Sequence, residues 1–118
     1  MSEEDKFIFE NLKVYQLSRE ITIELIKIAV KFPYQYSRIR DQLIGAVLSI
    51  PLNIAEGCGR YSPKDKINFY KIARSSNYEL VAILDICNEL KLLNKHIWFA
   101  KILSISKMLT KLIQSQNK

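Results

Sequence analysis

The sequence has few of the residues that interrupt helices and few that build catalytic or metal sites. Its 118 residues include three glycines, three prolines, two cysteines and one histidine. So few turn-forming residues favour long helices over many short strands. One histidine, without an HExxH motif, a glycine-rich phosphate loop or a nucleophile beside an obvious base, provides no convergent catalytic constellation. We therefore expect no enzyme activity, no cofactor and no metal.

Two further absences concern location and redox chemistry. No apolar run approaches the roughly 18 residues that a helix needs to cross a bilayer, and the first residues, Met1–Asp5, are acidic where a secretory signal would be basic. We expect a soluble cytoplasmic protein without a membrane role. Cys58 and Cys87 have no CxxC spacing, so we expect a buried pair of reduced thiols.

The length and the apolar spacing predict the fold class. A chain of 118 residues, 48% of them hydrophobic, is one domain that buries roughly two-thirds of its unfolded surface. Apolar residues recur at three- and four-residue spacing in four segments, which predicts four amphipathic helices. Their expected ranges are about 11–31, 37–58, 62–93 and 96–114. Short connections between long helices predict an all-α, antiparallel up-and-down four-helix bundle.

Local start and stop signals set these boundaries. Asn11 and Ser37 are good N-cap residues for the first two helices, and Phe32-Pro33 should end the first because a residue before proline resists helical geometry. Ser62-Pro63, followed by an acid in the first turn, is the clearest helix start in the chain. The start of the third helix is therefore the best-defined boundary.

The second predicted helix carries one narrow polar seam on an otherwise apolar rod. At 100° per residue the seam falls within an arc of about 80°. Its members are Arg38, Gln42, Gly45, Ser49, Asn53, Glu56 and Arg60. A helix this apolar should be central and packed on several sides. Its seam should face solvent, an oligomer axis or a polar network.

The stretch Ser49–Arg60 contains a proline inside this helical pattern. Pro51 should kink the helix and leave the carbonyl of Val47 without its usual donor. We expect water, or the side chain of Ser49 or Asn53, to satisfy that carbonyl. This interpretation makes the stretch a structural junction more than a binding site.

The end of the same stretch should form the turn into the third helix. Gly57 and Gly59 are expected to adopt left-handed conformations that end the second helix. Glu56 lies four residues before Arg60, the favourable order for an ion pair on a helix. The pair should place Arg60 beside the basic residues that follow.

Positive charge is concentrated in two regions of the chain. The net charge is +6, residues 60–74 carry five basic residues against Asp65, and residues 91–118 carry six lysines and no acid. Such clusters can bind polyanions by neutralising phosphates and releasing counterions. The candidate nucleic-acid contacts are Arg60, Lys64, Lys71 and Arg74, with Tyr70 and Tyr78 expected on the same side to stack a base or hold a cation. A lysine- and tyrosine-bearing bundle surface or subunit interface is the alternative.

Several segments also resemble a known family. They are Asn11–Gln16, Phe32-Pro33, Gln42-Leu43, Ser49–Arg60 and Ile72–Leu80. They are similar to the four-helix bundle proteins encoded in intervening sequences of bacterial large-subunit ribosomal RNA genes. The motif positions that carry over are Ser49, Pro51, Asn53, Glu56, Gly57, Gly59 and Arg60, together with Arg74, Ser76 and Glu79.

The resemblance has implications for assembly. It implies a homo-oligomer, a pentamer in known members of the family. It also implies kinship with the accessory variability determinant of diversity-generating retroelements, a basic pentamer that binds nucleic acid and a reverse transcriptase.

Two functional hypotheses of different classes follow. The first is an oligomeric, nucleic-acid-associated binding module that gathers basic patches from several subunits and binds RNA or DNA. The alternative is a homo-oligomeric scaffold that docks another protein, with basic residues serving only solubility.

Overall fold

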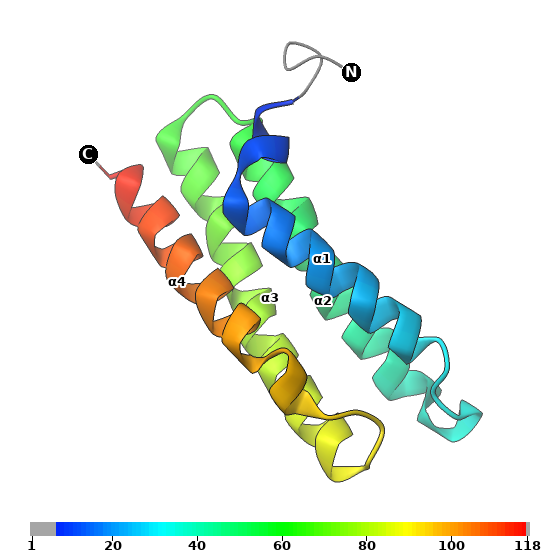
Figure 1. Ribbon diagram of the computed structural model, residues 1–118. Helices are drawn as coiled ribbons and strands as arrows, with labels where there is room; N and C mark the ends of the chain where they lie inside the picture. The colour runs from blue at the N-terminus through cyan, green and yellow to red at the C-terminus, as the bar shows by residue number, and fades with distance from the viewer. Residues whose placement is uncertain (1–6, 118) are drawn as a thin grey trace.

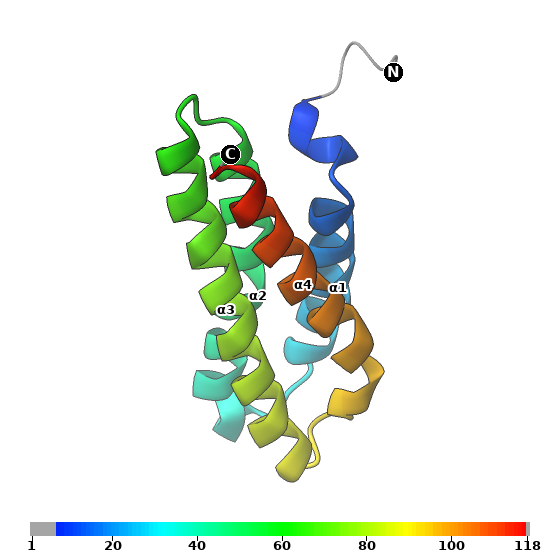
Figure 2. The ribbon, with the colours of Figure 1, turned by 90° about the vertical axis from the view of Figure 1, so that its left-hand side faces the viewer.

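The computed structural model describes residues 7–117, which contain four α-helices joined by short connections (Figure 1). The helices are α1 (Lys13–Ala29), α2 (Ser37–Cys58), α3 (Pro63–Glu89) and α4 (Phe99–Ser115). Short 3₁₀ turns lie at Ile8–Asn11, Tyr34–Tyr36 and Lys95–Ile97. Successive helices run in opposite directions (Figures 1 and 2). The predicted all-α, up-and-down four-helix bundle is confirmed.

The four helices do not pack equally against one another. The contact between α2 and α3 is the most extensive, α1 packs on α2 and α4 packs on α3, and the contact between α1 and α4 is the smallest. Figure 2 shows α4 lying across the front of the bundle, with α3 on one side and α1 on the other. The pair α2–α3 is therefore the centre of the structure.

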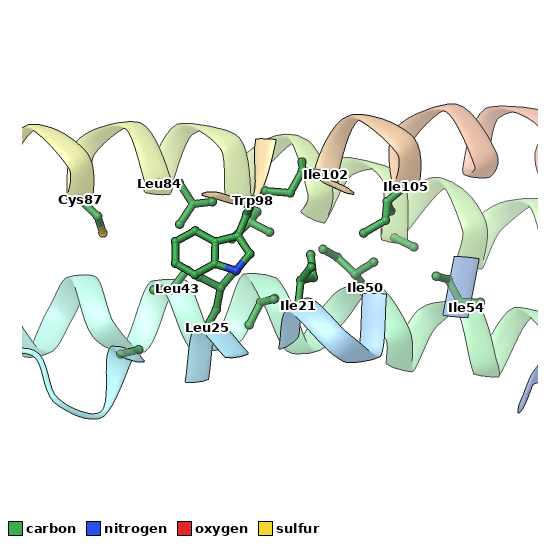
Figure 3. Close-up of a cluster of buried hydrophobic side chains, with 14 of the residues drawn as sticks. Ile21, Leu25, Leu43, Ile50, Ile54, Leu84, Cys87, Trp98, Ile102 and Ile105 are labelled. Carbon is green, nitrogen blue, oxygen red and sulfur yellow. The ribbon is translucent and has the colours of Figure 1, made fainter. Parts of the chain in front are cut away.

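The core fills the space between these helices. Large apolar side chains that are almost completely buried come from every helix: Ile21, Leu25, Leu43, Ile50, Ile54, Leu80, Leu84, Ile102, Ile105 and Leu109. Trp98, just before α4, inserts its ring between the α3–α4 and α1–α2 layers (Figure 3). Burying each such side chain contributes roughly 1.5–3 kcal/mol.

Two of the predicted helix starts are right and two N-caps are wrong. α2 has the predicted bounds, and Ser62 caps α3 because its Oγ accepts a hydrogen bond from the backbone N–H of Asp65 at 3.1 Å. Asn11 does not cap α1, since it lies in a 3₁₀ turn and Leu12 is the N-cap. Ser37 is the first residue within α2 and makes no capping hydrogen bond.

The end of α3 and the start of α4 differ from the prediction. α3 ends at Glu89 and not near Leu93, because Lys91 adopts a left-handed conformation with φ 62°. The backbone N–H of Leu92 then bonds the carbonyl of Cys87 at 2.9 Å, which is the Schellman arrangement. α4 begins at Phe99, three residues later than expected, because a 3₁₀ turn precedes it. α3 and α4 are thus shorter than their apolar patterns.

Two further predictions concern the state of the cysteines and the hydropathy of the helices. Both cysteines are free thiols, and Cys87 is buried as expected, whereas Cys58 is only half-buried. Within residues 7–117, none of the helices combines the length and apolar character that a membrane span requires.

Candidate nucleic-acid interface

Pro51 lies buried inside α2, and α1 supplies the hydrogen bond that the proline cannot make. The hydroxyl of Thr22 lies 3.1 Å from the carbonyl oxygen of Val47 and 2.7 Å from that of Ser18, and its single proton is shared between the two. The prediction that Ser49 or Asn53 would satisfy the Val47 carbonyl is therefore wrong. A buried carbonyl without a partner is costly, so the proline makes α2 depend on α1.

The middle of the polar seam forms a network between α2 and α3. The Nδ2 of Asn53 donates to the carbonyl and Oγ of Ser49 at 2.8 and 3.0 Å, and the hydroxyl of Ser76 donates to the same Oγ at 2.7 Å. Of the three environments expected for the seam, its middle has the polar network. The ends of the seam are exposed to solvent. Ser49 and Asn53 consequently stabilise the helix pair.

Gly57 permits the close approach of α3 to α2. A Cβ atom at this buried position would lie 2.7 Å from Cε1 of Tyr70 and 3.0 Å from Cβ of Phe69. Neither Gly57 nor Gly59 has a positive φ, and Gly59 ends α2 with φ −81°. The predicted left-handed glycines are therefore wrong. Gly57 is required for its missing side chain and not for its backbone freedom.

Tyr70 belongs to this junction and not to the basic surface. Its side chain is 2% exposed and covers Gly57. Burial, reinforced by the nearby Cys58 thiol, raises the pKa of Tyr70 to about 12. The expectation that Tyr70 shares a surface with the lysines is wrong. Tyr78, which is 58% exposed, does lie at the surface.

Arg60 lies in the short connection between α2 and α3. Its Nη2 donates to Oε1 of Glu56 at 2.8 Å, which confirms the predicted ion pair, and its guanidinium carbon lies 4.6 Å from the centroid of the Phe69 ring. The side chain is still 44% exposed. An exposed pair of this kind contributes up to about 1 kcal/mol, so Glu56 holds Arg60 in place while its outer edge stays accessible.

Lys66 has a structural role that was not predicted from the sequence. Its ammonium donates to the carbonyl of Cys58 at 2.9 Å and reaches that of Gly57 at 3.5 Å. These carbonyls end α2, where a cation also complements the helix dipole. A lysine closely following a predicted helix end was the available signal. One of the five basic residues of the 60–74 cluster is therefore already occupied.

Lys64 and Lys71 are the most accessible of the predicted contacts. They lie two turns apart on the outward face of α3, and both are exposed. Neither ammonium has an ion-pair partner among the residues that the structure describes. Because seven residues make nearly two full turns, the two charges point the same way.

Arg74 lies beside these lysines but is fixed against α4. Its Nε donates to the hydroxyl of Thr110 at 2.9 Å, its Nη2 donates to the hydroxyl of Tyr78 at 3.2 Å, and its guanidinium carbon is 4.9 Å from the Tyr78 ring centroid. Lys107 of α4 lies on the other side of that helix, where it lines a groove with α1 residues. Lys64, Lys71 and Arg74 thus lie on neighbouring sides of the first half of α3, whereas Arg60, over Phe69, lies on another side of that helix.

The fold and this surface place the protein in the class of four-helix bundle proteins. Its α2–α3 junction contains the buried Pro51 and Gly57, and its third helix begins with a basic face. The sequence matches, over residues 10–115, the sequence model of the family described as 23S rRNA-intervening sequence protein. The chain belongs to this family. A search of curated proteins finds no match.

Proposed function

We propose that this protein is a non-enzymatic binding module that holds nucleic-acid phosphates on the first half of α3, and that it works as a homo-oligomer. The observation that carries the proposal is the pair of exposed lysines, Lys64 and Lys71, which have no acidic partner within residues 7–117. Arg74 stands beside Lys71 in a fixed position, whereas Arg60 is held over Phe69, on another side of α3. Fixed guanidinium groups lose little freedom when a phosphate binds.

One chain offers few phosphate-binding side chains, so the proposal includes several copies. Each phosphate that is neutralised releases condensed counterions and contributes a modest, salt-dependent free energy. Joining several such surfaces in one particle raises their combined affinity without any new kind of interaction. The pentamer implied by the family resemblance would supply this multiplication. The implied kinship with the retroelement accessory determinant stays a prediction.

RNA is the first ligand to test, because the family description refers to an intervening sequence of 23S rRNA. Binding of labelled RNA and duplex DNA should be measured by fluorescence anisotropy at several salt concentrations. The affinity should fall steeply as salt rises. In the double variant Lys64→Gln/Lys71→Gln the salt slope should decrease by about one unit for each phosphate that the variant no longer neutralises.

The matched control is Lys27→Gln/Lys31→Gln, which removes the same charge from two exposed positions in and just after α1. This control should retain most of the affinity. Equal reductions in the two double variants would mean that net charge alone matters, and would contradict a defined interface. Undetectable binding at low salt would contradict the proposed function altogether.

A protein-docking scaffold is the second candidate, favoured by the intramolecular engagement of Arg60 and Arg74. In that case a pulldown should recover a stable protein partner that resists nuclease. Replacing Lys64, Lys71 and Arg74 with Glu should leave such a partner bound. The nucleic-acid module predicts instead that nuclease releases any recovered protein. It also predicts that the Glu substitutions abolish that recovery.

A further inference from the structure

The connection between α2 and α3 carries a tyrosine that its own chain does not use. Tyr61 is 101% exposed, so no side chain of residues 7–117 covers either face of its ring. An aromatic side chain stabilises a fold by burying its large apolar surface, and this ring buries none against the described residues. Nothing in the fold therefore requires an aromatic residue at this position.

The backbone on both sides of Tyr61 is held in place. The backbone N–H of Arg60 donates to the carbonyl of Gly57 at 3.1 Å, and Ser62 caps α3. The side chain of Arg60 is also paired with Glu56. The ring is thus carried by a connection whose shape is set before a ligand binds. Such pre-organisation reduces the conformational entropy that is lost on binding.

Tyr61 lies at one end of a row of basic residues, and a second exposed tyrosine lies at the other end. Lys64 follows Tyr61 by three residues, and α3 then presents Lys64, Lys71 and Tyr78 at intervals of seven residues. Seven residues make nearly two turns, so these three side chains share one side of α3 over about 21 Å. Tyr61, Lys64, Lys71 and Tyr78, all exposed, form what we call the aromatic–basic row.

Arg74 adds a second stacking surface at the Tyr78 end of the row. Its guanidinium carbon lies 4.9 Å from the centroid of the Tyr78 ring, and its Nη2 donates to the hydroxyl of that tyrosine at 3.2 Å. Aromatic rings and guanidinium planes are both surfaces on which unpaired bases stack. Asp85, seven residues beyond Tyr78, is paired with Lys95 at 2.7 Å, so the positive charge of the row is not offset there.

We infer that the aromatic–basic row binds single-stranded RNA, with an unpaired base stacked on Tyr61 and the adjoining phosphates held by Lys64 and Lys71. This inference rests on the proposed function and names the form of nucleic acid that the site takes. A positively charged surface that also carries aromatic side chains is the usual means of holding a single strand. Bases in a duplex are stacked on their neighbours, so their faces are closed to a tyrosine.

The first test compares three RNAs of equal length on the full wild-type chain by fluorescence anisotropy at one salt concentration. They are a single strand without self-complementarity, the same strand in a duplex, and an abasic strand that has the phosphates but no bases. The single strand should bind at least about fivefold more tightly than the other two, the lower end of what stacking one base contributes. A duplex or abasic strand that binds as tightly as the single strand would overturn the inference.

The second test removes the ring. Tyr61→Ala should weaken single-strand binding about fivefold and leave abasic-strand binding unchanged. Its salt slope should equal that of the wild-type chain because no charge is lost. Tyr61→Phe retains the ring and should retain the affinity. The exposed ring makes no contact that folding needs, so circular dichroism should show an unchanged unfolding midpoint. Tyr61→Ala with wild-type affinity for the single strand would overturn the inference.

The matched control is Tyr34→Ala. Tyr34 is 88% exposed, lies near Lys31, and belongs to the connection at the other end of α2. This variant should retain the wild-type affinity. Equal losses in Tyr34→Ala and Tyr61→Ala would mean that any exposed tyrosine near a lysine contributes, and would overturn the assignment to the aromatic–basic row.

Stacking is observed directly with 2-aminopurine, a fluorescent base analogue, placed in the single strand. At saturating protein its emission should be quenched by the wild-type chain and quenched less by Tyr61→Ala. Equal quenching by the two proteins would overturn stacking on Tyr61. The two proposals fail separately: undetectable binding of every RNA at low salt contradicts the proposed function and this inference with it, whereas equal binding of single strand and duplex contradicts this inference alone.

Discussion

Two consecutive regions of the chain, the Ser49–Arg60 stretch of α2 and the first half of α3, use their distinctive residues in opposite ways. In α2 the polar side chains of Ser49 and Asn53 bond one another and α3, and Gly57 accommodates Tyr70. At the start of α3, by contrast, Lys64 and Lys71 extend into solvent. The Ser49–Arg60 stretch is thus the structural junction between α2 and α3, called the joint below. The candidate interface is carried by the exposed lysines Lys64 and Lys71.

The largest expected effect tests whether Gly57 is part of that joint. Gly57→Ala should lower the free energy of unfolding by about 2 kcal/mol, because the new methyl group would overlap Tyr70 and force α3 away. Urea unfolding monitored by circular dichroism measures the change.

The matched control is Gly45→Ala in the same helix. Its methyl group meets no atom within 4 Å, so it should stabilise the isolated chain by about 0.5–1 kcal/mol. Equal changes in the free energy of unfolding at the two glycines would show that both substitutions act through helix propensity alone. The close approach of α3 at Gly57 would then not contribute to stability.

A somewhat smaller effect is expected at the hydrogen bond that compensates for Pro51. Thr22→Val keeps the shape of the side chain and removes the hydroxyl that reaches Val47. The buried carbonyl then has no donor, so the free energy of unfolding should fall by about 1–2 kcal/mol. The control is Thr110→Val, at a half-buried site in α4. It should lower the free energy of unfolding by less in the same urea experiment.

The pH dependence of stability sharpens the assignment of Tyr70 to the joint. Its pKa in the folded protein is about 12, above the ordinary value of 10.0. Between these values the unfolded chain has lost a proton that the folded chain keeps, so stability falls as pH rises through this window. Tyr70→Phe should show a smaller fall between about pH 10 and about pH 12. An identical fall in wild type and variant would mean that other groups cause it.

Much of the fold was predictable because its signals are local. The apolar spacing located all four helices, and Ser62, Pro63 and Asp65 marked the start of α3. The end of α3 was not predictable, since the left-handed residue there is Lys91 and neither glycine nor asparagine. The sequence therefore predicted the helices better than several of their boundaries, at either end.

The candidate site was predicted less well, because its details depend on contacts distant in sequence. Tyr70 lies at the edge of the apolar stripe of α3, and only its approach to Gly57 buries it. The donor to the Val47 carbonyl comes from Thr22 in another helix. Spacing within one helix shows neither contact. The exposed lysines were predictable, since each stands opposite the apolar stripe.

The most direct test of the division between joint and interface measures stability and RNA affinity together in two variants. Asn53→Leu removes the bonds to Ser49 and should lower the unfolding midpoint, with RNA affinity reduced only as far as folding or assembly is impaired. Lys71→Gln should leave the midpoint unchanged and weaken RNA binding. A fully folded and assembled Asn53→Leu protein that has lost only its RNA affinity would contradict the account.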